Sequence, residues 1–124
     1  MQTILVAGAT GKLGQYVVKE LKRNNYTTRI LTRNLQRLNG IRSFADEATQ
    51  ADLLGDLSGV CRGVDAIISC AGANMDVADV RNQTSFYDVD YRGNLNLLRE
   101  AQRSTVKKFV YVAVFGGQGL DSEY

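Results

Sequence analysis

The chain has 124 residues, of which 44% are hydrophobic, so it has the length and apolar content of one compact domain and no room for a second. Its formal net charge of +2, with no histidine, argues against the broad basic surface that follows nucleic-acid phosphates. The two cysteines, Cys61 and Cys70, stand in apolar surroundings and lack the further ligands of a zinc site, so we expect both to be reduced core residues.

The first elements alternate between strand and helix. Residues 2–7 (QTILVA) combine β-branched and aliphatic side chains and run into a glycine, which is typical of a strand buried on both faces. From Lys12 the apolar residues recur at helical spacing until Asn24 and its neighbour break the pattern, which predicts a helix. Residues 27–32 (TTRILT) predict a second strand.

The middle of the chain carries weaker patterns. A short helical stretch is expected over residues 35–38, and it stops at Gly40. Residues 41–45 are the candidate for a short third strand. Apolar residues then recur at a 3.6-residue period over residues 53–61 and are followed by an arginine and Gly63, which predicts a third helix with a glycine C-cap.

The last elements continue the alternation. Residues 64–70 (VDAIISC) predict a fourth strand, residues 86–102 a long helix and residues 109–115 a fifth strand. Strands that alternate with helices, without a tight-hairpin signal, imply right-handed crossovers and a parallel sheet. We therefore predict one α/β domain over residues 1–124, with a doubly wound parallel sheet of about five strands in the order 3-2-1-4-5 between two helical layers.

A glycine-rich turn, GATGKLG, joins the first strand to the first helix. Gly8 permits the sharp turn, Gly11 lets the backbone approach a pyrophosphate, and Gly14 lets the helix pack against the sheet. The free amides and positive dipole end of the helix then face the phosphates, as in a Rossmann-like dinucleotide site. The alternative is a turn that serves only chain reversal. The predicted contact residues here are Gly8, Thr10, Gly11, Lys12, Leu13 and Gly14.

The end of the second strand bears on the choice between NAD(H) and NADP(H). Arg33 follows Gly14 by nineteen residues, where an NAD-preferring site usually places an acid on the ribose 2′-hydroxyl. An arginine instead offers a bidentate contact for a 2′-phosphate, and Lys12 supplies a second positive charge. We therefore expect a site that includes Asn34 and prefers NADP(H), with NAD(H) as the weaker ligand. The alternative is that both cations are ordinary solvated charges.

Two further strand ends complete the predicted site. After the third strand, Asp46 and Glu47 offer an acid that accepts a hydrogen bond from the adenine amino group. After the fourth strand, small residues leave room for backbone to follow the adenine ribose and the diphosphate, although plain packing explains them equally well. These small residues are Cys70, Ala71 and Gly72.

The segments VAGATGKLG, LTRN, GVDAIISCAGA and FYDVDYRGNLNLLREAQRSTVKKFVYVAVFGG together resemble the atypical short-chain dehydrogenase/reductases, in particular the NmrA-like group, over nearly the whole chain. The resemblance implies an NAD(P)-binding Rossmann fold, with the glycine turn on the dinucleotide and Arg33 on the 2′-phosphate. It also implies that Asp90 and Asn94 face the nicotinamide side of the site. A solvated helix face is the alternative for these two residues.

Catalytic members of that family reduce a carbonyl with a Tyr-x-x-x-Lys pair and a hydroxyl residue at the end of the fifth strand. Here that strand ends in Val112, Ala113 and Val114, and Tyr124 is the last residue, so we predict no catalytic residue and no metal ligand. Three functions stay open: an NADP(H)-binding domain, an NAD(P)-dependent oxidoreductase on a small carbonyl substrate that takes its missing groups from absent sequence or a partner subunit, and a structural remnant with a vestigial site.

The resemblance also bears on length and location. Family members continue beyond the fifth strand, so we expect the cofactor half of a longer protein, truncated there. The edge of that strand, or the long helix, is then a candidate surface for a homo-oligomer. No apolar run reaches the roughly 20 residues that cross a bilayer, and the first residues lack a secretory signal. A cytoplasmic protein with no membrane or nucleic-acid partner is expected.

Overall fold

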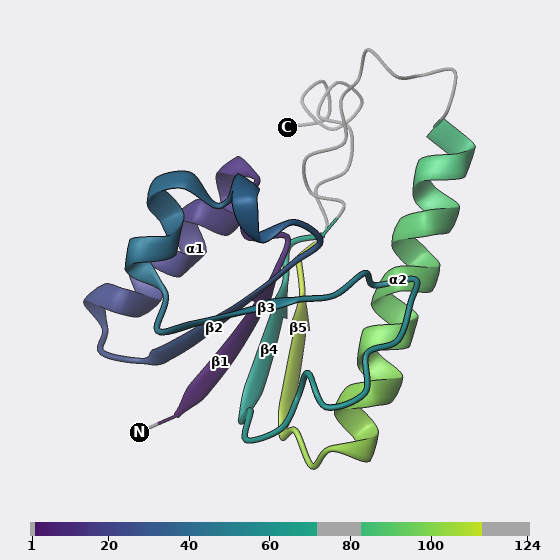
Figure 1. The fold of residues 1–124 in the computed structure, drawn as a ribbon. Coiled ribbons are helices and arrows are strands. Elements are labelled where there is room, and N and C mark those ends of the chain that lie inside the picture. Colours follow the sequence, from purple (N-terminus) through teal and green to yellow (C-terminus); the bar gives the residue numbers. More distant parts are fainter. Residues whose placement is uncertain (1, 72–82, 113–124) are drawn as a thin grey trace, which may run out of the picture.

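The computed structural model describes residues 2–71 and 83–112, and its centre is a five-stranded parallel sheet in the order β3-β2-β1-β4-β5 (Figure 1). The predicted fold class and strand order are therefore confirmed. The elements, in chain order, are β1 (Thr3–Ala7), α1 (Lys12–Arg23), β2 (Thr27–Thr32), the 3-10 helices η1 (Leu35–Arg37) and η2 (Asn39–Phe44), β3 (Glu47–Gln50), β4 (Ala66–Ser69), α2 (Gln83–Arg103) and β5 (Lys108–Tyr111).

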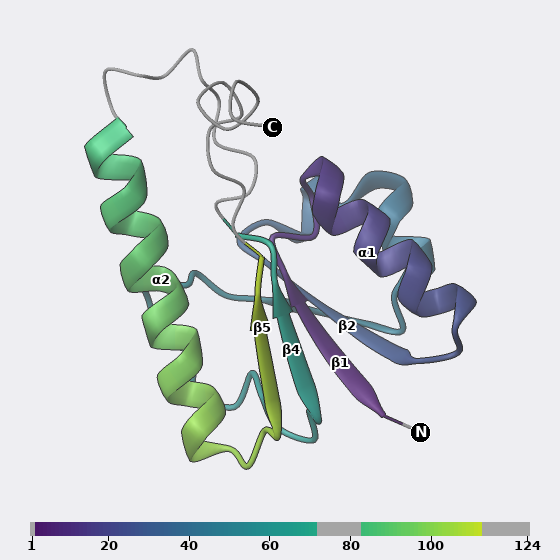
Figure 2. The same ribbon diagram turned by 180° about the vertical axis from the view of Figure 1, so that it is seen from behind.

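The strands bury side chains on both faces of the sheet. Successive side chains of a strand point to opposite faces. Leu5 accordingly belongs to a core that includes Leu97 of α2, whereas Val6 belongs to a second core that includes Val18 of α1. Figures 1 and 2 show α1 on one face of the sheet and α2 on the other. The sheet is thus the middle of three layers, as the sequence predicts.

The predicted strand over residues 41–45 is wrong. Most of that segment lies in η2, and the third strand begins at Glu47. Leu38, Ile41 and Ala45 are buried together in the core with α1. Their spacing of three and four residues places all three on one side of a helical turn. In a strand, side chains alternate between the two faces, so Ile41 and Ala45 would share a face with the residue midway between them. The apolar residues of the segment therefore correctly predicted its burial, but they did not predict its helical conformation.

The predicted helix over residues 53–61 is also wrong, because that segment forms a series of turns. Gly59 has a φ of +81°, in the left-handed region, which an α-helix does not tolerate. The turns still bury Leu57 and Cys61 in the core with α2. Arg29 of β2 holds them there, since its Nη1 donates to the Val60 and Arg62 carbonyl oxygens at 3.0 and 2.8 Å.

The two last predicted elements are present. The helix expected over residues 86–102 is α2, and it is slightly longer than expected. The fifth strand begins at Lys108, and residues 113–115 of its predicted range lie outside the described part of the chain. Among the described strands β3 and β5 are the two outer ones, and Tyr111 of β5 is about half exposed. Neither α1 nor α2 is long and apolar enough to cross a membrane, within the residues described.

Candidate functional site

The turn between β1 and α1 places two glycines where a larger residue does not fit. Gly8 has a φ of +76°, and an added Cβ would lie 2.6 Å from the Ala71 amide nitrogen. An added Cβ on Gly14 would overlap the Gly8 carbonyl oxygen and lie 2.7 Å from the Ala9 Cα. The start of α1 is therefore packed directly on the end of β1, beside the end of β4, and this is the tight turn that the glycine spacing predicts.

The first turn of α1 leaves its backbone amides available. Gly11 is the N-cap, no side chain among the described residues caps the helix, and its first turn contains no acidic residue. The first amides of an α-helix have no carbonyl partner within the helix, and the helix dipole adds a partial positive charge at this end. This end of α1, with Lys12 and Leu13 in its first turn, therefore suits a phosphate group.

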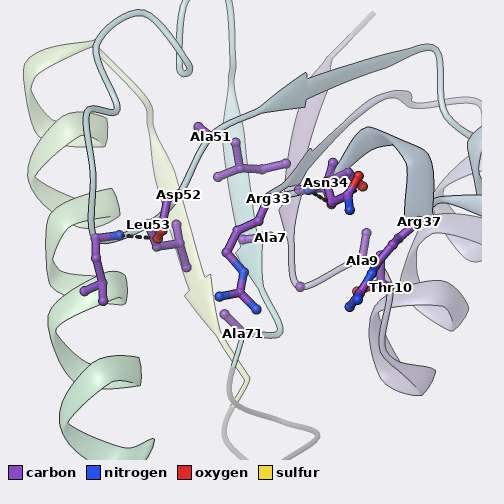
Figure 3. A pocket seen from close by; sticks show the side chains of 14 residues that line it. Ala7, Ala9, Thr10, Arg33, Asn34, Arg37, Ala51, Asp52, Leu53 and Ala71 are labelled. Atoms are coloured by element: carbon purple, nitrogen blue, oxygen red, sulfur yellow. Dashed lines mark hydrogen bonds between the residues drawn. The ribbon is translucent and has the colours of Figure 1, made fainter.

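A cavity of about 380 Å³ opens where the strands end (Figure 3). Its walls come from the β1–α1 turn, from the residues after β2 and β3, and from Ala71 after β4. In a parallel α/β sheet, ligands bind at this carboxyl edge, where the chain connections diverge to the two faces. Its lining includes Gly8, Thr10, Arg33, Asn34, Arg37, Asp52, Leu53 and Ala71.

Two arginines carry the positive charge of the cavity. Figure 3 shows Arg33 reaching across it toward Ala71 and Arg37 lying beside Thr10. Both side chains are exposed, and within residues 2–71 and 83–112 neither makes an ion pair or a side-chain hydrogen bond. Two guanidinium groups without a carboxylate partner favour an anionic ligand at this wall.

The loop that carries Arg33 is fixed by its own hydrogen bonds. The Thr32 hydroxyl accepts from the Asn34 amide and donates to the Asn34 carbonyl oxygen, both at 3.2 Å. The Asn34 side chain in turn accepts from the Gln36 amide at 2.9 Å and caps η1. Asn34 therefore lines the cavity and sets the direction in which the chain leaves β2.

The wall that follows β3 contains an acid. The Oδ1 of Asp52 accepts from the Leu54 amide at 2.9 Å, which fixes the side chain in a tight turn. The neighbouring Leu53 carbonyl oxygen accepts from the Asn96 side chain at 2.9 Å, so this wall is tied to α2. A carboxylate accepts several hydrogen bonds, and Asp52 therefore keeps capacity for a ligand donor.

A buried polar pair links β4 to α2. The Ser69 hydroxyl donates to the Oδ1 of Asn94, and both residues are buried. Asn94 is 9% exposed, so the alternative of a solvated helix face is wrong for this residue. The side chain of Asp90 lies outside the described part of the chain.

The structure brings most predicted site residues together. Those that line the cavity are Gly8, Thr10, Arg33, Asn34 and Ala71. The glycine turn and first helical turn beside it contain Gly11, Lys12, Leu13 and Gly14. Cys70 is buried, and its carbonyl carbon would lie 2.7 Å from a Cβ added to Gly8. Like Cys61, it is a free thiol. Gly72 lies outside the described residues.

Glu47 does not lie with them. It opens β3 opposite Arg29, at the far end of the strand from the cavity, and it pairs with the Arg29 guanidinium at 3.4 Å. The acid at the carboxyl end is Asp52, which sequence reasoning missed because the third strand was expected five or so residues too early. Arg37 was missed because the prediction gave the stretch over residues 35–38 no functional role. An acid directly after the true strand was the available signal for Asp52.

These features suit a dinucleotide. Small residues keep the strand ends open, and the start of α1 offers amides to a diphosphate. Arg33 and Arg37 offer positive charge to an adenosine phosphate, and Asp52 offers it a hydrogen-bond acceptor. Any Cβ on Gly8 would fill the approach between β1 and β4. The cradle therefore has the shape and the donor set that this ligand class requires.

The sequence matches the family described as NAD dependent epimerase/dehydratase over residues 4–117. It is 26% identical over 113 residues to the Photosystem II assembly factor Ycf39 of Synechocystis sp.. The matched region covers 90% of this chain and 33% of that protein. The chain thus spans about a third of the length of this curated relative.

Two solved structures share the fold. The putative NAD-dependent epimerase/dehydratase from Bacillus halodurans matches with a TM-score of 0.73 at 26% identity, over 98% of this chain and 56% of that one. The UDP-glucose-4-epimerase from Stenotrophomonas maltophila, with bound NAD and formylated UDP-arabinopyranose, matches with a TM-score of 0.76 at 20% identity, over 90% and 36%. The chain therefore belongs to the NAD dependent epimerase/dehydratase family and forms its nucleotide-binding Rossmann portion.

Proposed function

We propose that this chain is the NADP(H)-binding domain of an NmrA-like member of the family and is not catalytic by itself. The observation that carries the proposal is the position of Arg33. Arg33 directly follows β2, and its guanidinium group reaches into the cavity and has no anionic partner among the described residues. The end of β2 is where a Rossmann site distinguishes a ribose 2′-hydroxyl from a 2′-phosphate.

The chain's own residues bind and orient the adenosine half of the cofactor. The amides at the start of α1 hold the diphosphate, Arg33 pairs with the 2′-phosphate, and Asp52 accepts a hydrogen bond from the adenine amino group. A bound nicotinamide dinucleotide supplies a hydride donor or acceptor. The bound NAD of the Stenotrophomonas epimerase supports a dinucleotide ligand, and the preference for the phosphorylated form rests on Arg33.

The proposed preference has an expected size. A hydrogen bond to a charged group contributes roughly 1.5–3 kcal/mol, which corresponds to about 10- to 100-fold in affinity. NADPH gains such contacts at its 2′-phosphate and NADH does not. We therefore expect NADPH to bind about 10- to 100-fold more tightly than NADH at low salt.

Titration of the purified protein with each cofactor, followed by nicotinamide fluorescence, tests this. Arg33→Ala should lose most of the preference for NADPH and leave NADH binding nearly unchanged. Arg23→Ala is the matched control, because Arg23 is an exposed arginine at the end of α1 and pairs with Glu20. Equal affinity for the two cofactors contradicts the preference, and binding of neither favours a structural remnant.

A further inference from the structure

A second cavity, of about 250 Å³, opens between α1 and η2. α1 contributes Gln15 and Lys19 to its wall, and η2 contributes Phe44. Among the described residues, it shares Thr10 and Arg37 with the cavity at the strand ends. Most of its wall therefore belongs neither to the glycine turn nor to the end of β2.

The surface that the second cavity offers to a ligand is polar. Two of its apolar residues, Leu38 and Ile41, are buried, with 3% and 5% of their surface exposed. The third, Phe44, has one face of its ring covered by Lys19, whose Nζ lies 5.4 Å from the ring centre. A ligand therefore meets mainly the charged and amide-bearing side chains of the wall, and the cavity suits a hydrophilic ligand.

The second cavity lies in the basic part of the chain, because the charges are unevenly distributed along the sequence. Residues 1–44 contain eight of the 15 lysines and arginines and one of the 13 acids. That acid, Glu20, pairs with Arg23 at 2.9 Å, and no described residue of the cavity wall is acidic. Within residues 2–71 and 83–112 neither Lys19 nor Arg37 forms an ion pair. Two such cations on one wall favour a ligand with two negative charges.

Contacts within the fold hold both sides of the second cavity in place. On one side, the Gln15 side chain donates to the Thr10 carbonyl oxygen at 2.7 Å. On the other side, Arg42 Nη1 donates to the Ala45 carbonyl oxygen at 2.9 Å, which ties η2 to the residue that ends it. The aromatic contact holds the Lys19 ammonium group between these two sides. A ligand therefore finds this cation already positioned, and little conformational freedom is lost on binding.

We propose that the second cavity binds a phosphate dianion, either free phosphate or the phosphate group of a small hydrophilic ester. Lys19 is the cation of this site alone, and Arg37 is the second cation at the boundary between the two cavities. The volume corresponds to the liquid volume of about eight water molecules, which leaves room for a phosphate group with a small polar body. The site goes beyond the proposed function and does not depend on which dinucleotide the chain prefers.

Titration of the ¹⁵N-labelled protein with inorganic phosphate, at constant ionic strength and without cofactor, tests the site by NMR. Saturable shift changes should appear at the Gln15 side-chain amide and at the Gly40 amide, because both residues line the second cavity. Lys19→Gln removes one charge-assisted contact and should raise the dissociation constant measured at these signals by about 10-fold. Lys22→Gln is the matched control, since Lys22 is an exposed lysine of α1 outside the described wall, and it should change the constant by less than about 2-fold.

A second variant keeps the charge and loosens its position. Phe44→Leu removes the ring that faces the Lys19 ammonium group, so it should weaken phosphate binding by about 2- to 5-fold. Shift changes that do not saturate, or that respond equally to Lys19→Gln and Lys22→Gln, overturn the inference. The amide spectrum of each variant also shows whether its fold is unchanged.

Two further titrations identify the ligand and separate this site from the cofactor. Tighter binding of glycerol 3-phosphate than of inorganic phosphate, with no effect of glycerol, identifies an ester as the ligand, and equal affinity identifies free phosphate. Phosphate should still shift the Gln15 and Gly40 signals at saturating NADP⁺, whereas loss of these shifts makes the second cavity part of the cofactor site and overturns the inference. If neither NADP⁺ nor NAD⁺ binds, the proposed function fails while the phosphate titration still decides on the second cavity.

Discussion

Gly14 of α1 packs directly on the Gly8 carbonyl group, so closely that any Cβ at Gly14 would overlap the Gly8 oxygen. Since the overlapping atoms are backbone, a side chain cannot rotate away to relieve the contact, and the start of α1 must move. Gly14→Ala should therefore lower the free energy of unfolding by about 3 kcal/mol, measured by urea denaturation.

Gly40→Ala is the control for the Gly14 variant. Gly40 lies in η2, and no heavy atom of the described residues lies within 4 Å of an added Cβ. The same chemical change there should alter stability by less than about 0.5 kcal/mol. Equal midpoints of urea denaturation for the two variants would show that the close packing at Gly14 does not restrict which residue this position accepts.

The Ser69–Asn94 pair should contribute to stability because it is buried between β4 and α2. Ser69→Ala removes the donor to the Asn94 side chain from a site without solvent access. We expect a loss of about 1–2 kcal/mol in the free energy of unfolding. Ser43→Ala, which removes an exposed hydroxyl that donates to the Gly40 carbonyl oxygen, should cost less than about 0.5 kcal/mol. A loss of similar size in both variants contradicts a special role for the buried pair.

Arg29 should hold the turns between β3 and β4. Arg29→Met keeps much of the apolar stem but leaves the Val60 and Arg62 carbonyl oxygens without their charged donor. Hydrogen exchange should become faster over residues 57–63, and the free energy of unfolding should fall by about 2 kcal/mol. Arg23→Met removes an exposed ion pair of α1 and should leave both measurements nearly unchanged. Unaltered exchange over residues 57–63 in Arg29→Met would contradict the clamp.

The Cys61 thiol should respond to pH. Burial, and then the nearby Glu100 carboxylate, raise the pKa of Cys61 from its ordinary 9.0 to about 11. The folded state therefore keeps the thiol protonated where the unfolded chain ionises, so its contribution to stability is full below pH 9 and is lost as the pH rises to about 11. Iodoacetamide should alkylate Cys61 in a Cys70→Ala background slowly at pH 8 and much faster in urea. Rapid alkylation without urea would place the thiol at the surface.

The sequence predicts the ends of this fold better than its middle. The run from β1 through Gly8 into α1 is encoded locally, because a buried strand, a glycine turn and an amphipathic helix each leave their own pattern. In residues 53–61 the apolar spacing is helical, yet Gly59 in its left-handed conformation and the Arg29 contacts make turns of it. Burial was therefore correctly indicated there, and the backbone conformation depended on a residue of β2 far away in the sequence.

In the candidate site, too, some residues are positioned by a local sequence pattern and others by contacts that the local pattern does not encode. The position of Arg33 follows from the end of β2, which the pattern predicts. The position of Asp52 depends on where β3 ends, and that is decided by its pairing with β2, in which Glu47 meets Arg29. Arg37 depends on a short 3-10 turn that Asn34 caps, and a three-residue element leaves too little periodicity to read.

Asp52 should recognise the adenine, which NADPH and NADH share. Asp52→Asn preserves an oxygen that accepts from the Leu54 amide and replaces the other acceptor with a donor, so the turn should survive while the contact to the adenine amino group is lost. Both cofactors should then bind about 5-fold more weakly, with their ratio unchanged, as measured by the same titration. Asp56→Asn is the matched control, because that exposed carboxylate accepts only from Ser58 among the described residues. A selective loss of NADPH in Asp52→Asn would instead place this carboxylate near the 2′-phosphate, where its negative charge would oppose binding.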